Sequence, residues 1–349
     1  MHGLGNEGAV LHQRHEGCHG VFNTVNQFLT RDFIETKEGL VFAVVAPTME
    51  EGRVLCALRY QRQQGGFRKL TTMEAEALLM REAKGYLFSS KRCAARLHGV
   101  LSEDIVHHHQ AKERVKALLK SQPHDPAEAA AIACLQWFAS EGIPLDQLGL
   151  SGSLLLGAQG PDSDVDIVTY DRALFRRLQA LILKAIEDGR MAALDASAWH
   201  EAYARRGSAL TFEDYRWHEV RKANKAVIMG IKLDITLVVP SKETPRAALQ
   251  KKGITQIEAT VIDAEGGFDT PARFMLDHPK IAEIWVFSHT YVGQARAGET
   301  IRAQGQWEEG GQGMARLIVG SNREALGEYL MVIDGPSGGC PSTQEGSPP

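Results

Sequence analysis

The stretch from Leu148 to Asp171 (LGLSGSLLLGAQGPDSDVDIVTYD) constrains the fold of this chain more than any other. It begins with a short apolar run and turns at Gly152-Ser153, and about ten residues later it enters a run that alternates polar and apolar residues. Because the side chains of a strand alternate between two faces, Asp164 and Asp166 point the same way while their apolar neighbours point into a core. The segment therefore predicts two strands of one sheet, with two carboxylates on its polar face.

A third carboxylate follows on a later strand. The run from Ile231 to Leu237 also alternates, which leaves Asp234 on a polar face. Carboxylate oxygens suit hard divalent cations, so Mg²⁺ or Mn²⁺ is the expected cofactor. If the two strands are neighbours, Asp164, Asp166 and Asp234 could hold two cations that activate an attacking hydroxyl and bind a triphosphate.

The Gly152-Ser153 turn suits phosphate binding. Glycine lets the backbone approach a phosphate closely, and the serine hydroxyl and nearby N–H groups can donate to phosphate oxygens. A helix that begins near Leu154 would add its N-terminal dipole.

Together these residues resemble the signature of the nucleotidyltransferase superfamily that includes DNA polymerase β. That signature is an apolar residue, Gly-Ser, a gap of about ten residues and Asp-x-Asp on a strand, and here it spans Leu150 to Asp166. The resemblance covers about a hundred residues, from Leu148 to Val239. The chain is also similar to a group of predicted prokaryotic, largely archaeal-type, nucleotidyltransferases, at Arg31–Pro47 and at Arg221–Lys225.

The resemblance implies a polymerase β-like core, a mixed sheet with helices, and a role for each motif residue. Asp164 and Asp166 would bind both metals, and Asp234 would bind the catalytic metal and help to deprotonate the acceptor. The gap of 68 residues between Asp166 and Asp234 is long for the smallest members of the superfamily, and two helices are expected within it. The candidate nucleotide-binding residues are Gly152, Ser153, Ser163, Lys222, Lys225 and Lys232, the lysines by position alone.

The expected activity is transfer of a nucleoside monophosphate from an NTP, such as ATP, or a dNTP to a hydroxyl, with release of pyrophosphate. The acceptor stays open between a nucleic-acid 3′ end, a protein and a small molecule. The alternative is a non-catalytic nucleic-acid-binding or regulatory protein that retains the nucleotidyltransferase fold.

The pattern of apolar and turn residues along the sequence predicts an α+β or α/β chain of three domains. Strands are expected near Phe33, Leu40 and Val54, and helices at 73–83, 102–120, 173–187, 197–206 and 211–225. The predicted segments are a flexible N-terminus (1–27), an N-terminal α+β domain (28–122), the nucleotidyltransferase core (125–242), a small β-barrel or sandwich (252–334) and a disordered tail (335–349).

Bulk properties set the surroundings of the chain. Its net charge of −4 argues against a uniformly basic surface, although 205–232 holds seven bases against three acids, so a nucleic-acid partner stays possible. Five scattered cysteines, no long apolar run and no signal-like start favour reduced thiols, a cytoplasmic location and no membrane partner. The oligomeric state is not predicted.

Three other clusters have less specific explanations. The group His12, His15, Cys18 and His19 could hold zinc, but no second ligand pair follows, so a flexible segment is favoured. His107–His109 lies inside a helical pattern and is interpreted as a solvated turn. Trp285, Phe287 and Tyr291 could stack on bases but are expected in a core.

Overall fold

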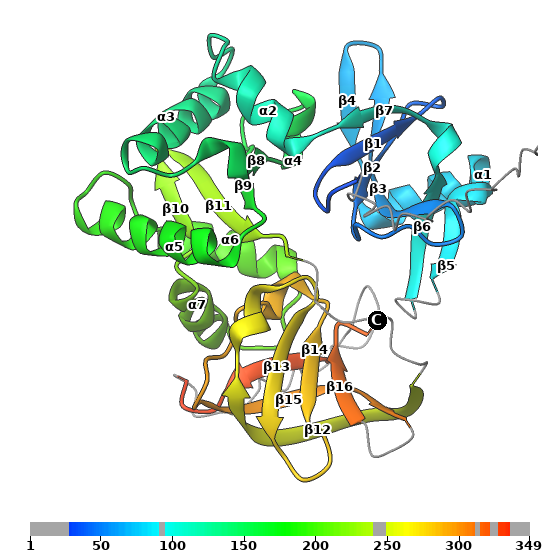
Figure 1. Cartoon of the computed structure of the whole chain (residues 1–349), viewed down its shortest axis with the longest axis vertical. Coiled ribbons are helices and arrows are strands. Elements are labelled where there is room, and N and C mark those ends of the chain that lie inside the picture. The colour runs from blue at the N-terminus through cyan, green and yellow to red at the C-terminus, as the bar shows by residue number, and fades with distance from the viewer. Residues whose placement is uncertain (1–27, 91–94, 240–248, 311–314, 322–326, 336–349) are drawn as a thin grey trace, which may run out of the picture.

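The computed structural model describes residues 28–90, 95–239, 249–310, 315–321 and 327–335. These residues form an α+β protein with seven α-helices and three sheets, which lie in three bodies (Figure 1). The coarse prediction of an α+β chain is therefore confirmed. The predicted flexible N-terminus, with its candidate zinc ligands, and residues 336–349 of the predicted tail lie outside the described residues.

The N-terminal body is a seven-stranded antiparallel sheet in the order β5-β6-β3-β2-β1-β7, with β4 paired to β3. The three strands expected near Phe33, Leu40 and Val54 are present and pair antiparallel. A helix, α1, begins with a capping box at Thr71 and Glu74. The elements are β1 Phe33–Thr36, β2 Leu40–Val44, β3 Arg53–Gln63, β4 Gly66–Lys69, α1 Thr72–Glu82, β5 Leu87–Ser90, β6 Ala95–Leu101 and β7 Ile105–His109.

The helix predicted over 102–120 is wrong in its first half. The chain there forms β7, which pairs with β1, and only Ala111–Leu118 is helical (α2). The three histidines are thus on a strand and not on a solvated helix turn. His108 Nε2 donates to Asp32 Oδ2 at 2.9 Å and His109 Nε2 to Glu35 Oε2 at 3.2 Å. The pairing of β7 with β1, together with these hydrogen bonds to two buried carboxylates, outweighs the local helical pattern.

The middle body is a four-stranded mixed sheet in the order β10-β11-β9-β8. The two central strands, β9 and β11, are parallel, and each outer strand is antiparallel to its neighbour. The strands are β8 Leu148–Leu150, β9 Val165–Thr169, β10 Lys225–Ile228 and β11 Ile231–Leu237. The helices around them are α2, α3 Pro126–Ser140, α4 Gly152–Leu156, α5 Arg172–Glu187, α6 Ala196–Arg206 and α7 Phe212–Arg221.

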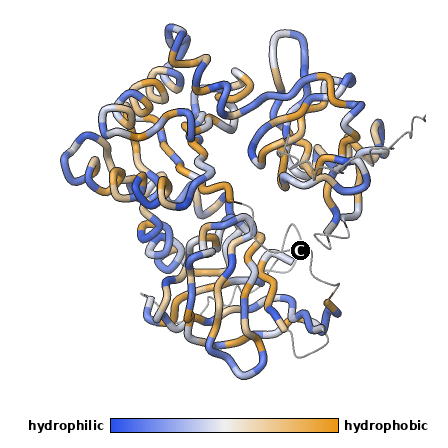
Figure 2. Tube along the Cα trace, viewed as in Figure 1, coloured by the Kyte–Doolittle hydropathy of each residue, from blue (hydrophilic) through white to orange (hydrophobic). Residues whose placement is uncertain are grey.

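Helices α3 and α5 cover one face of this sheet. The inward residues of β9 and β11, such as Ile167 and Leu233, share a buried core with Phe138 of α3 and Phe175 of α5. Figure 2 shows apolar stretches on these strands and on parts of the helices around them. The core also includes Leu118 of α2, a residue that was predicted to belong to the N-terminal domain. Burial of this face leaves the alternate residues of β9 and β11 on the other one.

The helix predicted over 211–225 ends earlier than expected. Helix α7 stops at Arg221, and Ala223 takes a left-handed conformation with φ 51° that cannot continue the helix. The residues that follow form β10, a strand that was not predicted from the sequence. Met229 and Gly230, both with positive φ, make the hairpin turn into β11.

The C-terminal body is a barrel, which decides between the two predicted alternatives. Five strands in the order β12-β13-β14-β16-β15 close on themselves because β15 also pairs with β12, and β17 adds to β15. The barrel is mixed, since β14 and β16 run parallel. Its strands are β12 Gln250–Asp263, β13 Ala272–Asp277, β14 Glu283–Val286, β15 Thr300–Glu309, β16 Ala315–Val319 and β17 Tyr329–Val332. Trp285 and Tyr291 are buried as predicted, whereas Phe287 is 44% exposed.

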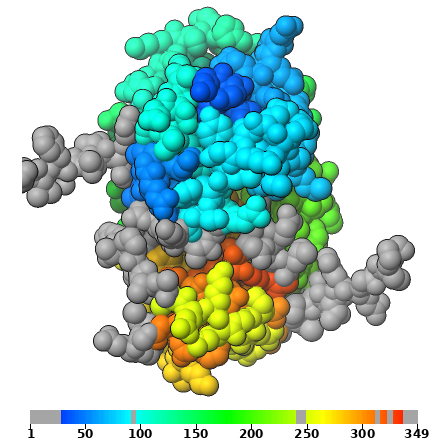
Figure 3. Space-filling view, turned by 90° about the vertical axis from the view of Figure 1, so that its right-hand side faces the viewer, coloured from blue at the N-terminus to red at the C-terminus, as the bar shows by residue number. Residues whose placement is uncertain are grey.

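Both flanking bodies contact the middle one. A buried apolar cluster joins Tyr60 and Val41 of the N-terminal sheet to Val168 of β9 and Val238 just after β11. Helix α7 adjoins the barrel, because the backbone N–H of Val332 donates to His218 Nε2 at 3.0 Å. The N-terminal body and the barrel occupy the upper and lower parts of one face in Figure 3. The middle sheet therefore lies where all three bodies can contribute side chains.

Two further predictions were the absence of a membrane partner and the presence of reduced thiols. No helix among the described residues is long and apolar enough to cross a membrane. Within the same residues, Cys56 and Cys134 are free thiols and both are buried.

Candidate active site

Two of the three predicted aspartates are direct neighbours on the middle sheet. In the parallel register of β9 and β11, Asp166 lies opposite Asp234, and Val165 lies opposite Leu233. The valine and the leucine are buried in the core beneath the helices, so the two carboxylates lie together on the opposite face. This pairing confirms that the Asp234 strand adjoins the Asp-x-Asp strand.

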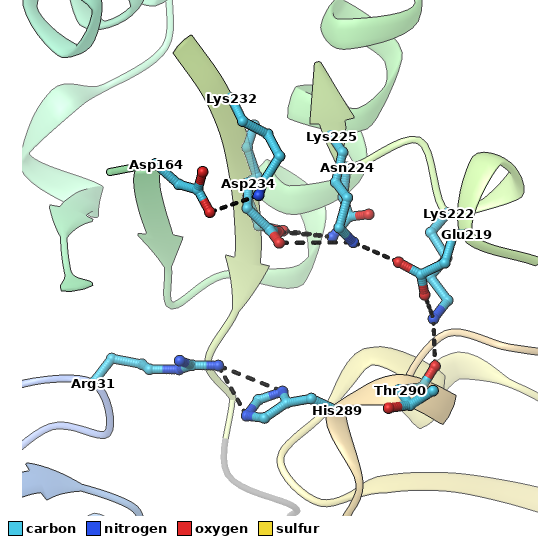
Figure 4. A network of polar contacts seen from close by, with 11 residues as sticks. Arg31, Asp164, Glu219, Lys222, Asn224, Lys225, Lys232, Asp234, His289 and Thr290 are labelled. Carbon is cyan, nitrogen blue, oxygen red and sulfur yellow. Dashed lines mark hydrogen bonds and ion pairs between the residues drawn. The ribbon is translucent and has the colours of Figure 1, made fainter. Parts of the chain in front are cut away.

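The third aspartate has a different partner. Asp164 precedes β9 and its Oδ2 lies 2.7 Å from Nζ of Lys232, the residue two positions before Asp234 (Figure 4). Among the described residues, no three His, Cys, Asp or Glu side chains come together in an arrangement that could hold a metal ion. The site therefore consists of an Asp166–Asp234 pair beside an Asp164–Lys232 ion pair, and not of a ready-made cluster of three carboxylates.

The electrostatics of the carboxylate pair favour a cation. Burial and the negative charge of Asp234 raise the pKa of Asp166 to about 6. Two adjacent carboxylates resist full ionisation, and a divalent cation between them would relieve that repulsion. The oxygen-only chemistry of the pair fits Mg²⁺ or Mn²⁺.

Position 152 requires a glycine because Asp166 lies directly against it. Its φ is +64°, and a Cβ built at this position would lie 2.2 Å from Asp166 Oδ2. The adjacent backbone is also fixed, because the N–H of Ser151 donates to the carbonyl of Asp166 at 2.9 Å. The glycine turn predicted for phosphate approach thus packs directly on a metal-ligand candidate.

The two candidate serines are brought together. Ser153 Oγ donates to Ser163 Oγ at 3.1 Å, and Ser163 Oγ accepts from the N–H of Gly160 at 2.9 Å. These bonds tie the start of α4 to the loop that enters β9. Both hydroxyls therefore lie beside the strand that carries Asp166.

Lys225 lies beside Asp234 as the sequence position suggested. Its Nζ is 3.7 Å from Asp234 Oδ2 and 2.8 Å from Glu219 Oε2. Burial alone would lower the pKa of Lys225, but the charges of Asp234 and Glu219 outweigh burial and raise it. Asn224 Nδ2 also donates to Asp234 Oδ1 at 3.3 Å and to the Ile235 carbonyl at 2.9 Å. The Asp234 carboxylate is thus held by two neighbours.

Lys222 faces a different environment. It is 3% exposed, its ammonium donates to Glu219, and it also donates to the Thr290 carbonyl of the barrel at 2.8 Å (Figure 4). Burial lowers the pKa of Lys222 to about 8. The structure therefore joins Lys222 to the barrel and leaves Lys225 and Lys232 as the lysines that contact the aspartates.

Sequence reasoning missed an arginine and a histidine at the edge of this site. Arg31 Nη2 donates to His289 Nε2 at 2.9 Å, which links the turn before β1 to the barrel (Figure 4). The positive charge of Arg31 lowers the pKa of His289 well below its usual value. Arg31 begins the N-terminal segment that carried the resemblance, whereas no motif marked His289.

Comparison with known proteins gives one relative. No protein-family model matches the chain, and no solved structure matches it. The uncharacterized protein MJ1086 of the archaeon Methanocaldococcus jannaschii is 28% identical over 335 residues, which cover 86% of this chain and 98% of that protein. The similarity thus extends across all three bodies and brings no activity with it.

Proposed function

We propose that this protein is a metal-dependent nucleotidyltransferase with a polymerase β-like core. The observation that carries the proposal is the Asp166–Asp234 pair on parallel strands, with Gly152 packed against one of its carboxylates. A sheet that only needed a solvated face would gain nothing from two adjacent like charges, one of them with a raised pKa. Such perturbed carboxylates are typical of functional sites.

Asp166 and Asp234 would hold the divalent cation, and Asp164 would join them on leaving Lys232. The bound cation would supply Lewis acidity toward a phosphoryl oxygen and lower the pKa of the acceptor hydroxyl. Asn224 and Lys225 orient Asp234 through their contacts with its two oxygens. Asp234 would then be placed to accept the proton of the acceptor hydroxyl.

The triphosphate would bind beside the Gly152 turn. The Ser153 and Ser163 hydroxyls, which lie beside this turn, can donate to phosphate oxygens. The Lys232 ammonium pairs with Asp164 and would be free to bind a phosphate once a cation replaces it beside Asp164. Lys222 would not contact the phosphate; it would act indirectly, by donating to Glu219.

The products would be pyrophosphate and an acceptor that carries a nucleoside monophosphate. The attacking hydroxyl oxygen bonds to the α-phosphorus as the bond to the β-phosphate oxygen breaks. The acceptor stays open between a nucleic-acid 3′ end, a protein and a small molecule.

The test is pyrophosphate release from each NTP and dNTP with Mg²⁺ or Mn²⁺ and a panel of acceptors. Wild type is compared with Asp166→Asn and with Asp162→Asn, an exposed aspartate of the same loop region. The proposal predicts release by wild type and Asp162→Asn, and a loss of about 100-fold or more in Asp166→Asn. Equal release by all three chains would refute it.

A non-catalytic binding protein with the same fold is the second candidate. One observation favours it: Asp164 and Asp234 each have a lysine ammonium within ion-pair distance, which already offsets part of their charge. In that case no triphosphate and acceptor would give pyrophosphate, and Mg²⁺ would leave the melting temperature unchanged.

A further inference from the structure

We propose that Arg31 binds a phosphoryl group of the substrate and that His289 of the barrel positions the Arg31 guanidinium for this role. The inference rests on the proposed function and names a site that the polymerase-like motif does not contain. It would make the N-terminal body and the barrel parts of one substrate site, beside the Asp166–Asp234 pair.

The backbone of Arg31 is held in place from two sides. Arg31 has a left-handed φ of 79°, which is uncommon for a residue other than glycine. Its N–H donates to the Val44 carbonyl at 3.0 Å, and its carbonyl accepts from Ser151 Oγ at 2.9 Å. Ser151 directly precedes Gly152, so the arginine is fixed against the turn of the proposed triphosphate site.

The guanidinium of Arg31 is oriented by an acceptor and not by a carboxylate. A guanidinium can only donate, so His289 Nε2 accepts the 2.9 Å bond and the imidazole is neutral in this contact. Among the described residues, no carboxylate lies within ion-pair distance of Arg31. The charge of Arg31 is therefore available to an anion, with His289 fixing its direction.

Positive charge gathers at this position. Arg31 lies within the electrostatic reach of Arg59 on β3 and Arg206 at the end of α6, as well as of Asp166 and Asp234. Within the described chain, neither Arg59 nor Arg206 forms an ion pair with a carboxylate. Three arginines from two bodies beside two aspartates leave a positive excess that an anion would offset.

The chemistry of these groups points to a phosphoryl oxygen. The planar fork of arginine binds phosphate through two parallel hydrogen bonds, a geometry that lysine does not supply. A phosphoryl group here could belong to the donor triphosphate or to a phosphorylated acceptor. Both sources share this chemistry, and the experiment below separates them.

The first experiment is calorimetric titration with inorganic tripolyphosphate in the presence of Mg²⁺. The variants are Arg31→Gln, Arg31→Lys, His289→Ala and His289→Gln. The control is Arg81→Gln of α1, since Arg81 is exposed and its ion-pair partner in the part of the chain that the structure describes is its neighbour Glu82. Arg31→Gln should weaken binding about 10-fold or more, and Arg31→Lys by less. His289→Ala should weaken it too, and His289→Gln should restore it because glutamine supplies an acceptor.

Equal affinity of Arg31→Gln and Arg81→Gln for tripolyphosphate would overturn the proposal, as would the absence of binding by wild type. Thermal unfolding of each variant separates loss of the fold from loss of the site. The readout needs no turnover, so a chain that never releases pyrophosphate but shows the Arg31 effect would refute the proposed function and leave this inference in place.

A second titration identifies the source of the phosphoryl group. Wild type and Arg31→Gln are compared for a nucleoside triphosphate and for a 5′-phosphorylated RNA oligonucleotide. A loss of affinity for the triphosphate alone assigns Arg31 to the donor, and a loss for the oligonucleotide alone assigns it to the acceptor. Unchanged affinity for both ligands would overturn the proposal.

Discussion

Replacement of Gly152 by alanine should damage the candidate site through one contact. The added Cβ would lie 2.2 Å from Asp166 Oδ2, and ordinary van der Waals contact begins at 3.4 Å. The carboxylate must therefore move by about 1 Å or the turn must open. The first response displaces Asp166 from its position opposite Asp234, and the second moves the Gly152 turn away from Asp166.

The magnitude has two parts. A left-handed φ, here +64°, costs an alanine about 1–2 kcal/mol. The overlap with Asp166 adds about 1–3 kcal/mol, the usual range for an extra methyl group in a packed site. If Asp166 serves catalysis, a displacement of about 1 Å should lower turnover about 100-fold.

Gly157→Ala separates the two parts. Gly157 ends the same short helix with φ +66°, but a Cβ there meets nothing within 4 Å. Urea denaturation should show Gly157→Ala destabilised by the backbone cost alone, about 1–2 kcal/mol, and Gly152→Ala by more. Pyrophosphate release should fall only in Gly152→Ala. If the two variants match in both stability and activity, the inferred clash with Asp166 is wrong.

Four further predictions concern titratable residues of the middle body and the cation that they would hold. The pKa of Asp166 rises from 3.8 to about 6 on folding, so the folded chain binds the extra proton and wild type should lose about 1–2 kcal/mol of stability as pH rises through that window; urea denaturation of Asp166→Asn should remove this slope. Burial lowers the pKa of His218 to about 4, so the stability of wild type should drop as pH falls from about 6.5 toward 4. His218→Phe should abolish this pH dependence, and it should also destabilise the fold by about 1–3 kcal/mol because the Val332 N–H is left unpaired. Glu219→Gln leaves the Lys222 and Lys225 ammoniums without their shared carboxylate and should cost about 3–5 kcal/mol, whereas the exposed Glu213→Gln should cost little by the same measurement. Mg²⁺ should raise the melting temperature of wild type and of Asp162→Asn but not of Asp234→Asn, and an equal rise in all three would place the cation elsewhere.

The centre of the site was predictable because strand periodicity is a local property. Alternation around Asp166 and Asp234 placed both carboxylates on one face, and the structure shows the two strands as parallel neighbours. The gap of 68 residues between them did not conceal the pairing, because each strand carries its own pattern.

What the sequence concealed depends on contacts between distant segments. Nothing local distinguishes a lysine that pairs with an aspartate, as Lys232 does with Asp164, from one that faces solvent. β7 was taken for helix and β10 was not predicted, because their pairing with β1 and β11 is tertiary. Arg31 and His289 meet across 258 residues, so only the assembled bodies reveal their contact.

Binding of Mn²⁺ in the presence of a nucleoside triphosphate, followed by electron paramagnetic resonance, tests the metal site most directly and requires no knowledge of the acceptor. Wild type and Asp162→Asn should bind the Mn²⁺–triphosphate complex alike. Asp166→Asn and Asp234→Asn should each bind it at least about 10-fold more weakly. Equal binding by all four chains would contradict a cation site at the Asp166–Asp234 pair.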